Sequence, residues 1–117
     1  MIPSSILELG PLRQGSDRRT ALDSARTLGQ HAERLGLRRI WVAEHHNSPA
    51  VSTAATSVVV SHIAAATTTI RVGAGGVMLP NHGPYVIADL AGTPARSRQR
   101  GDALSERVRS VEIQPKQ

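Results

Sequence analysis

The sequence predicts an α/β fold with a parallel sheet, built from three βα units whose strands end as they do in an α/β barrel. Two β-branched apolar runs, Ile40–Ala43 and Ile70–Val72, stop abruptly in small or polar residues that can carry chemistry. Parallel strands end in this way at the mouth of an α/β barrel. The short spacing from the first helix to the second strand also predicts a βαβ unit with a right-handed crossover.

The first unit begins at Ser5–Leu9, a strand that Gly10-Pro11 closes because this pair cannot continue a central strand. A helix then starts at Asp17 as its N-cap and ends at Gly36, a left-handed C-terminal stop. Apolar residues at intervals of three and four form its predicted inner face: Leu22, Ala25, Leu28, Ala32 and Leu35.

The second unit contains the strand 38–43, a loop over 44–51 and a helix that Ser52 is expected to cap, running to about Thr67. The β-branched triplet Val58–Val60 is also typical of a strand, but the length and the many alanines of this segment favour a helix.

The third unit opens with a strand from Ile70 that ends in a glycine-rich segment. A helix is expected from Pro84, with Val86, Ile87 and Leu90 facing inward. Gly92-Thr93-Pro94 is expected to break it. The chain thus divides into residues 1–90, which hold the three βα units, and an Arg-rich tail over 91–117, solvated or disordered.

Composition limits the class of protein. The 117 residues have room for one domain, and with 39% hydrophobic residues and no Phe the core is modest. With no cysteine, disulfides and thiolate metal sites are excluded. The N-terminus has no signal-peptide pattern, and the most apolar stretch, Ala50–Ala66, is shorter than a membrane span. We therefore expect a cytoplasmic protein without a membrane partner.

The formal charge of +5 raises the question of nucleic acid as a partner. The basic residues are spread along the chain, however, and only Arg96–Arg100 is densely charged. Aromatic residues, which stack on bases, make up 2% of the chain, so nucleic-acid binding is not expected.

Glu44-His45-His46 is the first candidate site, because two imidazoles beside a carboxylate offer proton transfer near neutral pH. Adjacent histidines at a strand end point in opposite directions, whereas a helix-borne zinc motif needs them one turn apart. We therefore expect no metal site, with one histidine facing the pocket and the other packing outward. The alternative is that both histidines only hydrogen-bond the backbone of the loop.

Gly73-Ala74-Gly75-Gly76 is the second candidate, because backbone without β-carbons lets a flat ligand approach closely. Met78 stands where a dinucleotide fingerprint would need glycine, and a Walker-type lysine is absent. A plain glycine bulge at the strand end is the alternative reading.

Two segments carry a family resemblance: Trp41-Val42-Ala43-Glu44-His45-His46-Asn47 and Val72-Gly73-Ala74-Gly75-Gly76-Val77-Met78-Leu79-Pro80-Asn81-His82. They resemble the second- and third-strand signatures of the bacterial-luciferase-like flavin-dependent monooxygenases. The resemblance implies a (β/α)8 TIM barrel, of which residues 1–90 are the N-terminal part with the first three βα units. Such a barrel binds reduced FMN at its C-terminal mouth, or the deazaflavin F420 in some relatives. The resemblance also implies a small-molecule substrate, O2 and a flavin reductase as partners.

The resemblance assigns site residues as well. It makes His45 the catalytic histidine, with Glu44 placing it, and Gly75-Gly76 a pair joined by a non-prolyl cis peptide under the flavin ring. The implied cofactor-binding residues are Ala74, Gly75 and Gly76 as the flavin floor, with Asn47 at the rim.

A complete barrel needs eight βα units and about 250 residues, and its phosphate site is expected after strands seven and eight. We therefore expect an incomplete fragment, truncated or frameshifted after about residue 88, with doubtful independent activity and open sheet edges that favour self-association. Two alternatives without catalysis stay open. One is a subunit that completes a barrel with another chain. The other is a small basic protein that binds nucleic acid through Arg96, Arg98, Arg100, Arg107 and Arg109.

Overall fold

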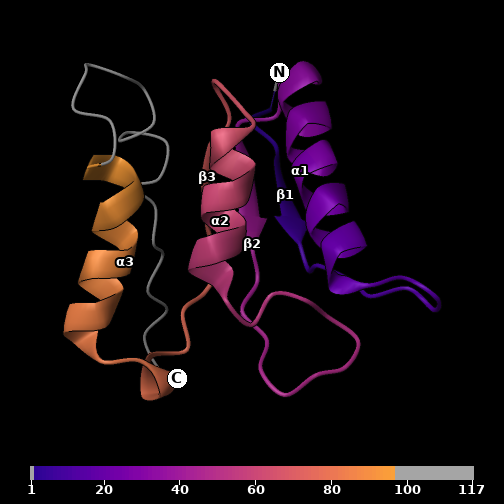
Figure 1. The fold of residues 1–117 in the computed structure, drawn as a ribbon. Coiled ribbons are helices and arrows are strands. Elements are labelled where there is room, and N and C mark those ends of the chain that lie inside the picture. Colours follow the sequence, from indigo (N-terminus) through magenta and orange to yellow (C-terminus); the bar gives the residue numbers. More distant parts are fainter. Residues whose placement is uncertain (1, 97–117) are drawn as a thin grey trace.

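The computed structural model describes residues 2–96 and contains a three-stranded parallel sheet (Figure 1). Its strands are β1 (Ser5–Glu8), β2 (Arg39–Val42) and β3 (Arg71–Ala74), in the spatial order β1-β2-β3. Ile6, Ile40 and Val72 share one register level across the sheet. The predicted α/β fold with parallel strands and three βα units is confirmed.

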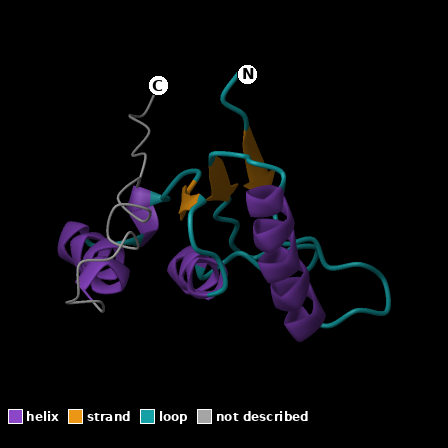
Figure 2. Cartoon of the chain, turned by 90° about the horizontal axis from the view of Figure 1, so that it is seen from above, coloured by secondary structure: helices purple, strands orange, loops and turns teal. Residues whose placement is uncertain are grey.

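Helices cover one face of this sheet. Figure 2 shows α1 (Arg18–Arg34) and α2 (Thr56–Ala65) on the same side of the strands, with α3 (Pro84–Arg96) beyond the β3 edge. The core lies between α2 and the sheet, where Ile40, Val42, Val72 and Ile63 have no exposed surface. The opposite face carries no helix within residues 2–96.

Helix α1 begins and ends where the sequence predicts. The Asp17 carboxylate accepts hydrogen bonds from the Thr20 N–H at 2.8 Å and the Thr20 hydroxyl at 2.7 Å, and Gly36 has a φ of +75°. The prediction that Leu35 faces inward is wrong, because this residue is 63% exposed. It is the C-cap residue, so its side chain has already left the buried face of the helix.

Helix α2 starts at Thr56, with Ala55 as its N-cap, three residues later than expected, and Ser52 does not cap it. Both the backbone N–H and the hydroxyl of Ser52 donate instead to the Gly10 carbonyl, at 2.8 and 3.0 Å. Next to this contact Pro11 and Val51 form an antiparallel bridge. The segment before α2 is thus held by the loop that follows β1. The predicted β-branched helix around Val58–Val60 is confirmed.

Helix α3 starts at Pro84 as predicted but runs through Gly92–Pro94 to Arg96, so the predicted break is wrong. Pro94 keeps φ near the helical value but has no N–H to donate one turn back, and the helix ends two residues after it, at Arg96. The expected inner face is also wrong, because Val86 and Leu90 are 50% and 40% exposed.

Residues 97–117, which hold most of the predicted basic tail, lie outside the described residues, and the domain boundary at 90/91 stays a prediction. Within residues 2–96, the helices are too short or too polar to cross a bilayer.

Candidate functional site

The two candidate segments lie side by side because they follow neighbouring parallel strands. The Ala43 N–H donates to Glu8 at 3.0 Å and the Gly75 N–H donates to Val42 at 2.8 Å, which continues the parallel pairing one residue beyond each strand. Glu44 and Gly75-Gly76 therefore emerge at the same edge of the sheet, the carboxyl ends of the strands, where α/β folds bind ligands.

Glu44 is the centre of this edge, and only 3% of its side chain is exposed. The Nε2 atoms of His46 and His82 lie 2.5 and 2.6 Å from its Oε1. Its Oε2 accepts the Met78 N–H at 3.0 Å. We call these three side chains, Glu44, His46 and His82, the carboxylate–imidazole cluster. It connects the end of β2 to the segment after β3.

The cluster keeps Glu44 ionised. Burial raises the pKa of its carboxyl, but the hydrogen bonds from His46, His82 and the Met78 N–H outweigh that effect, so the pKa lies below its usual value. A buried carboxylate with several donors aimed at it is stable as an anion, and it orients the imidazoles that contact it.

Three potential metal-ligand atoms meet in the same cluster, all within 4.8 Å of one another. The side chains that could hold a metal ion are thus Glu44, His46 and His82, an arrangement that the sequence did not predict. In the structure each imidazole hydrogen-bonds directly to the carboxylate, and these contacts satisfy the carboxylate without an ion.

Beside the cluster lies a shallow depression of about 280 Å³, which we call the mouth depression. Its lining is mostly apolar: Leu7, Ala43, Glu44, Gly75, Gly76, Val77 and Met78. A Cβ on Gly75 would lie 3.2 Å from Leu7 Cδ1 and 3.3 Å from Trp41 Cβ, so glycine allows close packing on the sheet. A Cβ on Gly76 would meet nothing within 4 Å, so its backbone borders open space.

The prediction of a cis peptide bond between Gly75 and Gly76 is wrong, because no peptide bond within residues 2–96 is cis. A non-prolyl cis bond costs about 3–4 kcal/mol and persists only where surrounding groups over-determine it. The open space around Gly76 supplies no such constraint.

His45 and Asn47 lie elsewhere at this end of the sheet. Both line a second depression of about 320 Å³, here called the lateral depression, together with Arg18, Ser48, Pro49, Val51, Ser52 and Ala54. Asn47 is exposed and has a φ of 52°, a left-handed conformation that asparagine tolerates. Glu44 contacts His46 and His82, whereas His45 lines the lateral depression and is not placed by Glu44.

His82 is the site residue that sequence reasoning missed. It follows the short 3-10 helix η1 (Leu79–Asn81), which brings it back toward the end of β2. A signal was present in the sequence, since residues after adjacent parallel strands meet at one edge and a histidine after β3 is within reach of a carboxylate after β2. His82 was not predicted because it lies eight residues beyond Ala74, the last residue of β3.

Comparison with known proteins decides the family. A family model described as luciferase-like monooxygenase matches residues 5–95. The chain belongs to this family. It is 49% identical over 92 residues to a luciferase-like monooxygenase of Escherichia coli K12, covering 79% of this chain and 28% of that protein. It is 38% identical over 89 residues to an N-acetyl-S-alkylcysteine monooxygenase of Bacillus subtilis, covering 76% of this chain and 27% of that protein.

Solved structures agree with the family assignment. The crystal structure of apo-MsnO8 matches with a TM-score of 0.73 and 37% identity, over 76% of this chain and 27% of that one. The oxygenating constituent of 3,6-diketocamphane monooxygenase from Pseudomonas putida, solved with FMN, has the same fold at a TM-score of 0.67 and 18% identity, over 76% of this chain and 25% of that one. This luciferase-like chain thus spans about a quarter of the length of the relatives it matches.

Proposed function

We propose that this chain forms part of the active-site mouth of a flavin-dependent monooxygenase, which uses reduced FMN and O2 to oxygenate a small molecule. A flavin reductase would supply the reduced FMN, and the deazaflavin F420 is the alternative cofactor. The observation that carries the proposal is the open backbone of Gly76 beside the buried Glu44 carboxylate of the carboxylate–imidazole cluster, at the carboxyl end of a parallel sheet.

The residues of the mouth depression suit a planar ring system. Gly76 presents flat backbone with free space above it, so Ala74, Gly75 and Gly76 can serve as the floor. Leu7, Val77 and Met78 add apolar surface around it. Residues 2–96 offer the ring side of a flavin site, since the phosphate of such a cofactor is expected near the loops after the seventh and eighth strands of the barrel.

When bound, reduced flavin supplies the electrons that activate O2. In the proposal, Glu44 orients His46 and His82 and holds the Met78 N–H, which fixes the segment after β3 next to the floor. His45 transfers a proton at the mouth, a role that rests on the family resemblance, and Asn47 lies at the rim beside it.

A titration of the full 117-residue chain with FMN, followed by flavin fluorescence, tests the proposal. The variant Gly76→Val places its Cβ in the open space above the floor, where nothing lies within 4 Å, so we expect flavin binding to weaken by about tenfold or more, equivalent to about 1.4 kcal/mol. Gly83→Val is the matched control, because Gly83 is exposed and lies outside the mouth depression.

Equal affinities of Gly76→Val and the unchanged chain would overturn the assignment of the floor. The same titration with F420 decides between the two cofactors. His45→Ala should leave flavin affinity within about twofold of the unchanged chain, since His45 lines the lateral depression and not the floor.

A further inference from the structure

The three side chains of the carboxylate–imidazole cluster come together from separate parts of the chain. Glu44 and His46 follow β2 and His82 follows η1, yet their potential ligand atoms all lie within 4.8 Å of one another. The ring centroids of His46 and His82 are 6.0 Å apart and the ring planes are inclined by 55°, so the rings are not stacked. Both rings instead direct Nε2 at one oxygen, Oε1 of Glu44, at 2.5 and 2.6 Å. Two imidazole nitrogens and a carboxylate oxygen thus converge on one point.

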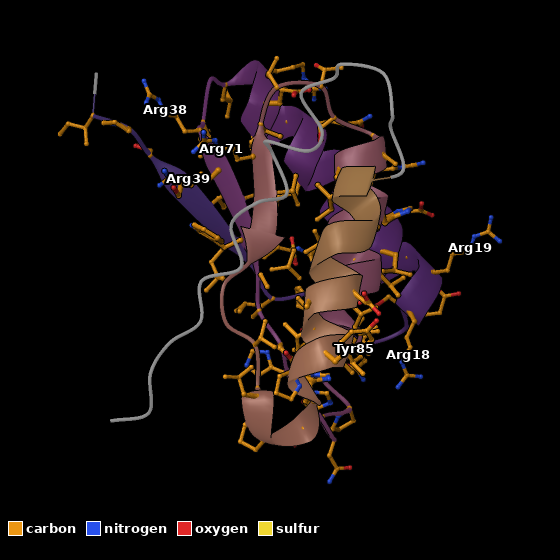
Figure 3. The ribbon with its side chains drawn as sticks, turned by 90° about the vertical axis from the view of Figure 1, so that its left-hand side faces the viewer. Arg18, Arg19, Arg38, Arg39, Arg71 and Tyr85 are labelled. Carbon is orange, nitrogen blue, oxygen red and sulfur yellow. The ribbon has the colours of Figure 1, made fainter. Side chains whose placement is uncertain are left out.

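The hydrogen bonds satisfy Glu44 as an acceptor but leave its charge uncompensated. Only 3% of the side chain is exposed, and a buried carboxylate is normally paired with a cation or bound to a metal ion. Within residues 2–96, the ion pairs of Glu44 involve imidazoles and no lysine or arginine. Figure 3 shows Arg38, Arg39 and Arg71 at the amino ends of the strands, the opposite end of the sheet from the cluster. Neutral imidazoles do not cancel the negative charge, whereas a divalent cation on the same atoms does.

We propose that the cluster binds one Zn²⁺ ion through His46 Nε2, His82 Nε2 and Glu44 Oε1. Two histidines and one glutamate are a known ligand set for zinc, with water in the fourth position. Ligand atoms around a tetrahedral zinc ion lie about 3.3 Å apart, so each imidazole must withdraw from Oε1 by less than about 1 Å. The His46 and His82 side chains are 34% and 24% exposed, so they can make this movement and water can reach the fourth position.

The surroundings of the three ligands favour this ion. The Met78 N–H donates to Oε2 at 3.0 Å, which holds the Glu44 carboxylate with Oε1 towards the imidazoles. Imidazole nitrogens suit Zn²⁺, whereas Mg²⁺ and Ca²⁺ prefer oxygen ligands. A bound Zn²⁺ ion fastens the segment after β3, which carries His82, to the end of β2.

The expectation of no metal site considered only the adjacent histidines His45 and His46. These two do separate, since His45 lines the lateral depression and His46 contacts Glu44. The second imidazole of the proposed zinc site comes from His82, on a different segment of the chain.

Calorimetric titration of the full 117-residue chain with Zn²⁺, in the absence of flavin, tests the proposal. We expect one ion per chain and no binding of Mg²⁺ at the same concentrations. NMR signals of the imidazole nitrogens give a second readout, because the chain has five histidines. Zn²⁺ should shift the Nε2 signals of His46 and His82 and leave those of His31 and His62 in place.

Ligand variants locate the ion. His82→Ala removes one of three ligands, so the affinity for Zn²⁺ should fall by about tenfold or more. His82→Gln should cause the same loss, because its amide can still donate to Glu44 and hold the segment after β3 but offers no imidazole. His31→Ala is the control, since His31 is an exposed residue of α1 that contacts Arg34, and affinity should stay within about twofold.

Capture of Zn²⁺ by the adjacent pair His45 and His46 would give a different pattern, in which His45→Ala weakens binding and His82→Gln does not. That pattern would overturn the proposal, as would equal losses in His82→Gln and His31→Ala, or the absence of Zn²⁺ binding. Because no flavin is present in these titrations, a failure of the zinc site is distinct from a failure of the flavin site.

Discussion

Two carboxylates that accept several hydrogen bonds lie at opposite ends of the sheet, and they differ in what they do there: Glu33 is half-buried and Glu44 is buried. Glu33, in the last turn of α1, accepts hydrogen bonds on Oε1 from the Thr68 N–H at 2.8 Å, the Ile70 N–H at 2.9 Å, the Thr69 hydroxyl at 2.9 Å and the Thr69 N–H. Glu44, at the carboxyl ends of the strands, accepts from two imidazoles and one backbone N–H.

The two carboxylates differ in the groups that donate hydrogen bonds to them. Backbone amides next to β3 are fixed by the fold, so Glu33 joins α1 to the start of β3 and stabilises the sheet. Imidazoles can rotate and exchange protons, and the His46 and His82 side chains are 34% and 24% exposed. In barrels of this type the amino ends of the strands serve stability and the carboxyl ends carry the chemistry. Under the proposed function, the two glutamates divide along that line.

The largest expected effect is the loss of Glu33. Glu33→Ala leaves three backbone N–H groups without their acceptor, so the free energy of unfolding should fall by about 2–3 kcal/mol in urea denaturation. Asp23→Ala is the control, because among the described residues the Asp23 side chain makes only an exposed pair with Arg26, and its loss should change stability by less than about 0.5 kcal/mol. Similar losses in both variants would show that Glu33 does not hold α1 to β3.

The pH dependence of stability follows from the same residue and should be smaller. Burial raises the pKa of Glu33, but the N–H groups of Thr69, Ile70 and Thr68 lower it more, to about 2 from 4.5. A carboxyl whose pKa is lower in the folded state stabilises the fold fully above its unfolded pKa. Stability should therefore decline as the pH falls from about 4.5 towards 2. Urea midpoints across this range should fall less steeply for Glu33→Gln, and parallel curves would contradict this account.

Local patterns predicted most of the framework because they depend on neighbours in the chain. Asp17 caps α1 through its own first turn, and Gly36 ends the helix in a left-handed conformation, so both could be read from sequence. The role of Ser52 could not be predicted in this way, because its hydroxyl donates to the Gly10 carbonyl, which is 42 residues away in the chain.

The candidate site was predicted in its location but not in its contacts. Glu44, Gly75 and Gly76 lie together because parallel strands end at one edge, a rule that needs no coordinates. The partner of Glu44 depends on how the segment after β3 turns back through η1, and that turn brings in His82 and leaves His45 apart. Tertiary packing decides such choices between chemically equal histidines.

The smallest change in stability is expected at the carboxylate–imidazole cluster. Glu44→Gln keeps the size of the side chain and one acceptor oxygen, and the two partly exposed imidazoles can turn to water instead. The free energy of unfolding should therefore fall by about 1 kcal/mol or less. The local effect should be larger, since the Met78 N–H loses a charged acceptor. Its amide hydrogen should exchange about tenfold faster, equivalent to about 1.4 kcal/mol of local opening.

The Thr68 amide provides the internal reference for this measurement, because it is held by Glu33 at the other end of the sheet. In Glu44→Gln its exchange should not change, while Glu33→Gln should reverse the pattern and expose Thr68 without affecting Met78. If both amides responded to either substitution, the two ends of the sheet would open as one unit. The division between a stabilising glutamate and a site-forming one would then fail, because the carboxylate–imidazole cluster would contribute to the same cooperative unit as the amino ends of the strands.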